Sequence, residues 1–177
     1  IPVNRHEHGI RRTSTVPCEL PEQHLKRARE IAETIAAALD YVGVLAVEMF
    51  YVGDNGGEPL MVNEFAPRVH NSGHWTLDAC TVSQFENHMR AVAGWPLGST
   101  ERHSDARMQN LIGAEADDWG TPAADPLAAP HLYGTPEAPP GRTRGHVPRL
   151  PPRRPGPAPA RPPPTHTSHP PPPPHTP

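Results

Sequence analysis

Prolines divide this chain into two unequal parts. Of the 27 prolines in 177 residues, 15 fall between Pro148 and Pro177, among arginines, histidines, threonines and alanines. This segment has almost no large apolar side chain to bury, so we expect residues 148–177 to be disordered or polyproline-like. Residues 1–147 have the size of an ordinary domain and can bury a core. Folded structure is therefore expected before Pro148.

Charge and hydropathy exclude several classes of protein. The 16 basic and 19 acidic residues are interspersed and leave a net charge of −3, which argues against nucleic-acid partners. No apolar run approaches the roughly 20 residues that span a bilayer, and no signal-peptide pattern is present, so we expect no membrane role and a cytoplasmic location. Cys18 and Cys80 lack metal-type spacing and are interpreted as reduced thiols. Because the chain begins at Ile1, we expect it to be a fragment.

Apolar spacing predicts a mixed α+β fold. Residues 20–40 carry apolar side chains three and four positions apart, which indicates an amphipathic helix with Pro21 in its first turn. A capping box that begins at Ser83 predicts a second helix, which ends at Gly94. Residues 99–147 show only weak strand signals and are predicted to form a small, mostly β region with long loops.

A β-hairpin is predicted in the middle of the chain. Two apolar runs, 41–52 and 59–65, flank an Asn-Gly turn signal. Each run carries one glutamate, Glu48 or Glu64, and both are equally distant from Gly56, so a symmetric register makes them face each other. Opposed like charges destabilise a sheet, and a divalent cation such as Mg²⁺ removes the repulsion. A one-residue slip would place them on opposite faces, and a lone strand glutamate usually faces solvent, so both interpretations stay open.

The segment Asn63–Trp75 combines an acid, an arginine, two histidines, two asparagines and a glycine directly after a predicted strand. Loops that follow strands frequently carry function. Arg68 offers a planar fork for phosphate or carboxylate oxygens, and His70 and Asn71 offer further donors. Each residue alone is compatible with a polar loop packed under Trp75. Together they indicate an anion-binding loop beside a Mg²⁺ site.

This segment also resembles a known family. Asn63–Trp75, with residues 41–50 before it and Met108–Gly113 after it, is similar to the 5-(carboxyamino)imidazole ribonucleotide synthases of purine biosynthesis, the PurK family of ATP-grasp ligases. The opening segment Asn4–Ile10 resembles the start of the same half of the family's ATP-grasp domain. The resemblance runs from about Pro2 to Val147. It implies three regions: the second half of an ATP-grasp domain (1–98), a small, mostly β C-terminal domain (99–147) and the disordered Pro-rich tail (148–177).

The resemblance implies a ligase that uses ATP and Mg²⁺, or Mn²⁺, to activate bicarbonate as carboxyphosphate. The carboxyl group then passes to aminoimidazole ribonucleotide, giving ADP and phosphate, in a protein expected to be a homodimer when intact. Catalysis would be electrostatic, without a protein nucleophile. The implied residues are Glu48 and Glu64 for the metal, His6, Asn63 and Glu64 for the nucleotide, Arg68, His70 and Asn71 for bicarbonate or carboxyphosphate, and Arg142 and Arg144 for the ribonucleotide phosphate.

Three departures from the family pattern affect these expectations. The first half of the ATP-grasp domain has no counterpart here, so the chain supplies one wall of an ATP site and is expected to be inactive alone. Thr143 stands where the family has a lysine, which weakens the expected phosphate grip of Arg142 and Arg144. The segment after Val147 resembles nothing in the family.

Two alternatives remain open from the sequence. The first is another ATP-grasp carboxylase or ligase, but Ala66 occupies the position of an asparagine typical of biotin carboxylases, and Val69–Trp75 favours the purine enzyme. The second is a truncated, non-catalytic product whose proline runs, such as 161–164 or 170–174, dock into an SH3- or WW-type groove.

Overall fold

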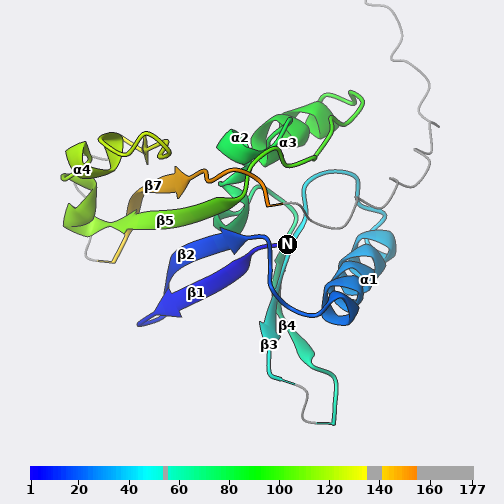
Figure 1. The fold of residues 1–177 in the computed structure, drawn as a ribbon. Coiled ribbons are helices and arrows are strands. Elements are labelled where there is room, and N and C mark those ends of the chain that lie inside the picture. The colour runs from blue at the N-terminus through cyan, green and yellow to red at the C-terminus, as the bar shows by residue number, and fades with distance from the viewer. Residues whose placement is uncertain (54–55, 135–140, 155–177) are drawn as a thin grey trace, which may run out of the picture.

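The computed structural model describes residues 1–53, 56–134 and 141–154, and it confirms an α+β fold (Figure 1). A five-stranded sheet has the order β1-β2-β5-β7-β6, and a separate hairpin consists of β3 and β4. All pairings within them are antiparallel. The elements, in chain order, are β1 (Val3–Glu7), β2 (Ile10–Val16), α1 (Glu22–Ala38), β3 (Ala46–Tyr51), β4 (Leu60–Ala66), the 3₁₀ turn η1 (Asn71–Gly73), α2 (Thr76–Ala79), α3 (Gln84–Val92), β5 (Ala106–Ile112), η2 (Gly113–Ala116), α4 (Gly120–Ala123), β6 (His131–Leu132) and β7 (Thr143–Arg149).

The five-stranded sheet joins the two regions that the sequence analysis placed in separate domains. β2 pairs with β5 from Thr13 opposite Gln109 to Val16 opposite Ala106, so the predicted division at residues 98 and 99 does not separate two sheets. Pairing between strands so distant in sequence is set by backbone hydrogen bonds and burial, and local patterns carry little information about it. Residues 1–16, 106–134 and 141–149 therefore form one structural unit.

Ordered structure also continues past the predicted boundary at Val147. β7 extends to Arg149, and Pro152 forms an isolated bridge with Ser104. Pro148 has no N–H to donate, but its carbonyl accepts a hydrogen bond from Ala129 N at 3.0 Å. The first residues of the predicted tail are thus part of the sheet region, and residues 155–177 lie outside the described residues.

Several predicted elements are confirmed with shifted ends. The first helix spans Glu22–Ala38, with Pro21 at its N-cap rather than in its first turn. In the second helix, Ser83 Oγ accepts a hydrogen bond from Glu86 N, as the capping box predicts. The first hairpin strand begins at Ala46 rather than at residue 41, and turn residues 54 and 55 lie outside the described residues. The strands β2 and β7 were not predicted.

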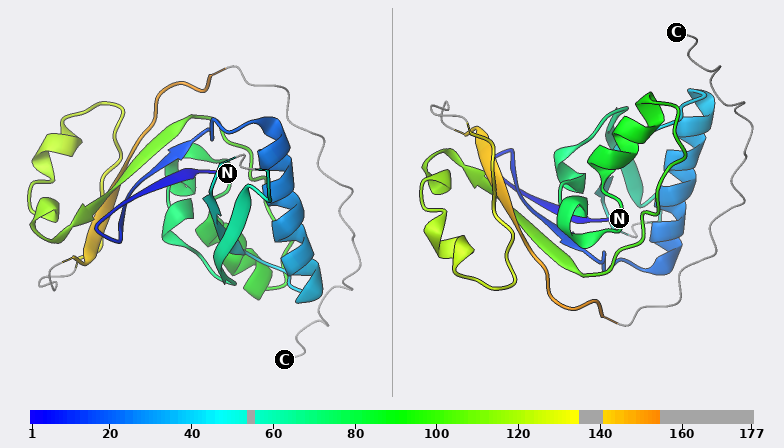
Figure 2. Two further views of the ribbon diagram at one scale, coloured as in Figure 1. Left: turned by 90° about the horizontal axis from the view of Figure 1, so that it is seen from below. Right: turned by 90° about the horizontal axis from the view of Figure 1, so that it is seen from above.

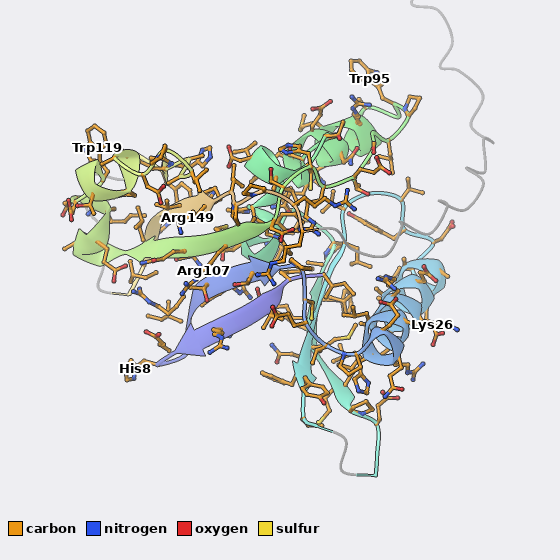
Figure 3. The ribbon with its side chains drawn as sticks, in the orientation of Figure 1. His8, Lys26, Trp95, Arg107, Trp119 and Arg149 are labelled. Carbon is orange, nitrogen blue, oxygen red and sulfur yellow. The ribbon has the colours of Figure 1, made fainter. Side chains whose placement is uncertain are left out.

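The core lies between the sheet and the segment that follows β4. Its buried cluster consists of Val16, Trp75, Ala79, Cys80, Ala106 and Met108. α1 lies against the β3–β4 hairpin, beside this core (Figure 2). Trp95 and Trp119 project from separate parts of the surface (Figure 3). Both cysteines are free, and among the described residues no helix is long and apolar enough to cross a membrane.

Candidate active site

Glu48 and Glu64 are directly paired across the hairpin, as predicted, although the register between this pair and the turn is shifted by one residue. Their environments differ: the Glu48 side chain is 13% exposed and the Glu64 side chain is 55% exposed. The pairing then shifts, because Met49 faces Val62 and leaves Asn63 as the extra residue of a bulge. A bulge re-aims the residues beside it. Asn63 thereby lines the cavity next to the two carboxylates.

Arg11 neutralises one of the two carboxylates. Its Nη2 forms an ion pair with Glu48 Oε1, and its Nη1 donates to Asn71 Oδ1 at 3.4 Å. Asn4 Nδ2 donates to the same Glu48 oxygen at 3.2 Å, and Ser14 Oγ holds Asn4 by donating to its Oδ1 at 2.7 Å. The Arg11 side chain is 12% exposed, so the pair is largely removed from water. Glu48 therefore has a fixed position before any ligand binds.

A bulge in β2 places Arg11 on the correct face. Ser14 faces Asn4 and Thr13 faces Arg5, but the next pair is Arg11 with His6, so one residue of β2 is unpaired. In a regular strand, side chains alternate between faces, and Arg11 would point away from Ser14's face. The extra residue reverses this alternation and brings Arg11 to the side of the sheet that Ser14 occupies.

His70 completes the group. Its Nε2 lies 3.4 Å from Glu64 Oε1, and its Nδ1 lies 2.9 Å from Ser72 Oγ. Burial, followed by the positive charge of Arg11, lowers the pKa of His70, so the imidazole is neutral at pH 7. One ligand atom each from Glu48, Glu64 and His70 lies within 4.8 Å of the other two. Two carboxylates and a neutral imidazole fit Mn²⁺, and the two carboxylates fit Mg²⁺.

Asn71 is held rather than free. Its amide exchanges two hydrogen bonds with the amide of Asn110, at 2.9 and 2.8 Å. Asn110 is 1% exposed and also donates to the Arg11 carbonyl at 3.0 Å. This arrangement fastens the segment after β4 to both β2 and β5. Asn71 therefore supports the geometry of the site and already uses much of its own hydrogen-bonding capacity.

A cavity of about 640 Å³ opens beside these groups. Its walls come from β1, α1, β3, β4 and the segment His70–Trp75, and they include four of the predicted residues: His6, Glu48, Asn63 and His70. His6 and Asn63 are exposed, and Glu48 is partly buried. The structure thus brings the predicted metal and nucleotide residues to one side of the molecule.

The predicted arginines differ in how free they are. Arg68 is exposed, and its Nη1 donates to the neighbouring Val69 carbonyl at 2.9 Å. Arg144 is the extra residue of a bulge between β5 and β7, and its Nη1 donates to Gly113 O at 3.0 Å and to Asp117 Oδ1 at 2.8 Å. Arg142 is exposed just before β7. Arg144 is therefore used by the fold, whereas Arg68 and Arg142 can turn toward a ligand.

A second cluster of titratable groups lies behind the segment that follows β4. His131 Nε2 is 2.8 Å from Asp78 Oδ2, and the rings of His131 and His146 stack with centroids 4.7 Å apart and planes 18° apart. An imidazole lone pair lies in the ring plane, so two stacked rings cannot both point at one metal ion. We therefore interpret Asp78, His131 and His146 as packing support, although their ligand atoms are close together.

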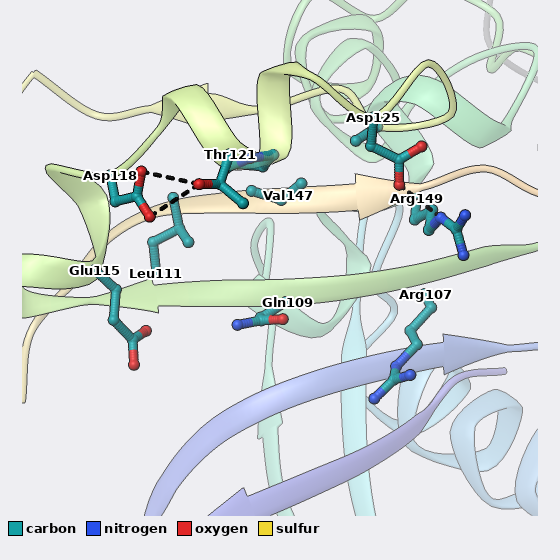
Figure 4. Close-up of a pocket in the computed structure, with 11 residues that line it drawn as sticks. Arg107, Gln109, Leu111, Glu115, Asp118, Thr121, Asp125, Val147 and Arg149 are labelled. Atoms are coloured by element: carbon teal, nitrogen blue, oxygen red, sulfur yellow. Dashed lines mark hydrogen bonds and ion pairs between the residues drawn. The ribbon is translucent and has the colours of Figure 1, made fainter.

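Another cavity, of about 480 Å³, lies along β5 and β7 beneath α4 (Figure 4). Three of the five charged side chains that line it are in ion pairs: Asp125 with Arg149 at 2.7 Å, and Glu115 with Arg12 at 2.7 Å. Thr121 Oγ1 donates to Asp118 at 3.0 Å. These pairings leave few groups to recognise a ligand, so the cavity beside Glu48 is the better candidate.

Local sequence patterns do not single out the residues that hold the predicted ones in place. Asn4, Arg11 and Asn110 contact partners far away in sequence, Arg11 through a strand bulge, whereas Ser72 contacts His70 two residues away. Asn4, Ser72 and Asn110 lie within the segments that carry the family resemblance. The signal in the sequence that could have identified such a residue is a polar side chain at an otherwise apolar strand position, such as Asn110 in β5.

A family model described as the ATP-grasp domain matches residues 1–85. The chain is 53% identical over 150 residues to the N5-carboxyaminoimidazole ribonucleotide synthase of Brucella melitensis, a match that covers 85% of this chain and 41% of that protein. The chain thus spans about two fifths of the length of this relative.

Solved structures give the same result. The N5-carboxyaminoimidazole ribonucleotide synthetase from Thermus thermophilus matches with a TM-score of 0.75 and 44% identity, over 84% of this chain and 40% of that one. The N5-carboxyaminoimidazole synthase from Aspergillus clavatus, in complex with ADP and 5-aminoimidazole ribonucleotide, matches with a TM-score of 0.78 and 32% identity, over 85% and 42% of the two chains.

Proposed function

Because the chain belongs to the N5-carboxyaminoimidazole ribonucleotide synthase family of ATP-grasp ligases, we propose that it forms one wall of an ATP-dependent carboxylase site. The reaction proposed for the whole enzyme begins with phosphorylation of bicarbonate by ATP, which gives carboxyphosphate and ADP. The exocyclic amine of aminoimidazole ribonucleotide then takes the carboxyl group, releasing phosphate and a proton. The convergence of Glu48, Glu64 and His70 beside one cavity is the observation that carries this proposal.

Glu48 and Glu64 are proposed to hold Mg²⁺ or Mn²⁺ on the phosphates of ATP. The metal, when bound, neutralises phosphate charge and positions the transferred group. Arg11 already neutralises the charge of Glu48. Glu48 and Glu64 therefore repel each other less than two unpaired carboxylates at the same separation would. His6 and Asn63, which line the same cavity, are proposed to contact the nucleotide.

Arg68 and His70 are proposed to hold bicarbonate or carboxyphosphate, with Asn71 holding the segment in place. Arg68 is exposed and free to reach an anion, whereas the amide of Asn71 is shared with Asn110 and Arg11. A neutral His70 can donate a hydrogen bond to developing charge without being a cation in the resting state. Catalysis by these residues is electrostatic, as expected for transfer without a protein nucleophile.

Arg142 is proposed to contact the ribonucleotide phosphate, and Arg144 is proposed to support it. This proposal differs from the expectation that both arginines bind the phosphate, because Arg144 is tied to Asp117 and to the Gly113 carbonyl. Arg142 is linked to the same region through its own carbonyl, which accepts from Gly113 N at 3.0 Å. The expectations of an inactive isolated chain, a homodimeric whole enzyme and a cytoplasmic location stay predictions.

Loss of one carboxylate should weaken metal binding. In the 177-residue chain, Glu64→Gln is expected to lower Mn²⁺ affinity by about tenfold or more, because it removes a charged oxygen ligand. Mn²⁺ electron paramagnetic resonance measures free and bound ion directly. The matched control is Glu58→Gln, which removes the same charge from an exposed position where Glu58 pairs with Arg27. Equal affinities for the wild type and Glu64→Gln would contradict the metal assignment.

A further inference from the structure

The side chain of Gln84, the first residue of α3, lies against the segment that carries His70. Its Oε1 accepts a hydrogen bond from His70 N at 3.1 Å, and its Nε2 donates to His70 O at 2.9 Å. The amide therefore binds both backbone groups of one residue, as a neighbouring β-strand would. Only a side chain with a donor and an acceptor in this fixed arrangement can make both bonds.

The same amide reaches a second histidine of the segment. Nε2 of Gln84 lies 2.8 Å from Nδ1 of His74. Because an amide nitrogen can only donate, Nδ1 of His74 is the acceptor, and its ring proton sits on Nε2. Both hydrogens of the Gln84 amide nitrogen are then used. The contacts with His70 and His74 together fix which end of the amide is oxygen and which is nitrogen.

Gly73 gives independent support for the close fit. A Cβ added to Gly73 would lie 2.7 Å from Oε1 of Gln84, which is closer than real Cβ atoms approach, and 3.0 Å from its Cδ, which is a tight contact. The backbone of Gln84 is also anchored, because its N–H donates to Thr76 Oγ1 at 3.0 Å, and Thr76 in turn donates to Gly73 O at 2.7 Å. The segment from His70 to Thr76 therefore packs closely around Gln84 and is hydrogen-bonded to it at several points.

We propose that Gln84 is a positioning residue, which holds the His70 backbone so that the imidazole meets Glu64. His70 Nε2 is 3.4 Å from Glu64 Oε1, and its Nδ1 is held by Ser72, so the ring direction depends on where the backbone lies. Gln84 touches neither carboxylate in the described structure. Its contribution is to the geometry of the ligand set, and groups that orient metal ligands typically change affinity 10- to 100-fold. This inference rests on the proposed metal site for its functional readout.

The test replaces the amide while keeping its shape. In the 177-residue chain, Gln84→Met removes all three hydrogen bonds and is expected to lower Mn²⁺ affinity about tenfold and to accelerate hydrogen exchange at the His70 amide by a similar factor. Gln84→Asn keeps the amide but is one methylene too short to bridge His70, and the same two changes are expected. The matched control is Gln109→Met, at an exposed amide of β5 in the other cavity.

The outcomes separate this inference from the proposed function. If the wild-type chain does not bind Mn²⁺, the metal assignment fails, and exchange at the His70 amide still decides the role of Gln84. If the wild type binds Mn²⁺ while Gln84→Met and Gln84→Asn bind it equally well and protect the His70 amide as well as the wild type does, Gln84 is not a positioning residue. A folded Gln84→Asn keeps the test decisive should Gln84→Met unfold.

Discussion

Replacing Glu48 with leucine is expected to lower the free energy of unfolding by about 3 kcal/mol, whereas Glu64→Leu should change it by less than about 1 kcal/mol. The two residues face each other across one hairpin, but only Glu48 is buried against a cation. Its loss leaves the charge of Arg11, whose side chain is 12% exposed, without its partner. The Glu64 side chain is 55% exposed, so water can solvate the groups that lose their contact with it.

Denaturant unfolding of four variants measures this difference. The four variants are Glu48→Leu, Glu64→Leu, Arg11→Met and the double variant that combines Arg11→Met with Glu48→Leu. Replacing both members of a buried ion pair by apolar residues is often nearly neutral, so the double variant should recover most of the loss seen in Glu48→Leu. A double variant as unstable as the sum of the two single variants would show that Arg11 and Glu48 do not stabilise the fold as a pair.

This asymmetry also shows how far the sequence could predict the site. The pairing of Glu48 with Glu64 was predicted from their equal distance to the turn, but it depends on the bulge at Asn63, because the register from Met49 opposite Val62 to the turn is shifted by one residue. The partner of Glu48 did not follow, because Arg11 reaches it only through a strand bulge in β2. A regular strand pattern would have placed Arg11 on the other face of the sheet. Bulges have weak sequence signals, so local patterns pointed to the candidate metal ligands and missed the residues that hold them in place.

The fold shows the same division between local and distant information. α1 and α3 were predicted because apolar spacing and a capping serine are local signals. The pairing of β2 with β5 was not, because it joins residues about ninety positions apart. β7 was missed for a different reason: Pro148 lies within it, and proline normally argues against a strand interior. The Pro148 carbonyl accepts a hydrogen bond from Ala129 N, and the strand needs no N–H donor at this position, so it tolerates the proline.

The histidines behind the segment that follows β4 should make the fold sensitive to acid. Burial lowers the pKa of His74 to about 4 and that of His146 to about 3, and each lies beside the other with ring centroids 5.2 Å apart. Their neighbours include Tyr133, whose hydroxyl is 2.8 Å from His146 Nδ1, and the Asp78–His131 pair. In the unfolded chain both histidines titrate near their ordinary pKa of about 6.5. At pH 5 both histidines are therefore neutral in the folded protein and protonated in the unfolded chain.

Stability should consequently fall as the pH is lowered from 7 to 5. In this window the unfolded chain binds more protons than the folded chain, so the free energy of unfolding rises with pH and decreases on acidification. Each histidine contributes about 2 kcal/mol to this change, and the pair roughly 4 kcal/mol. Urea unfolding at a series of pH values measures the slope. His146→Gln should remove about half of it, and His103→Gln, at an exposed site, should leave it unchanged. A wild-type stability that is constant between pH 7 and pH 5 would show that these two rings are protonated in the fold, and that burial does not hold them neutral.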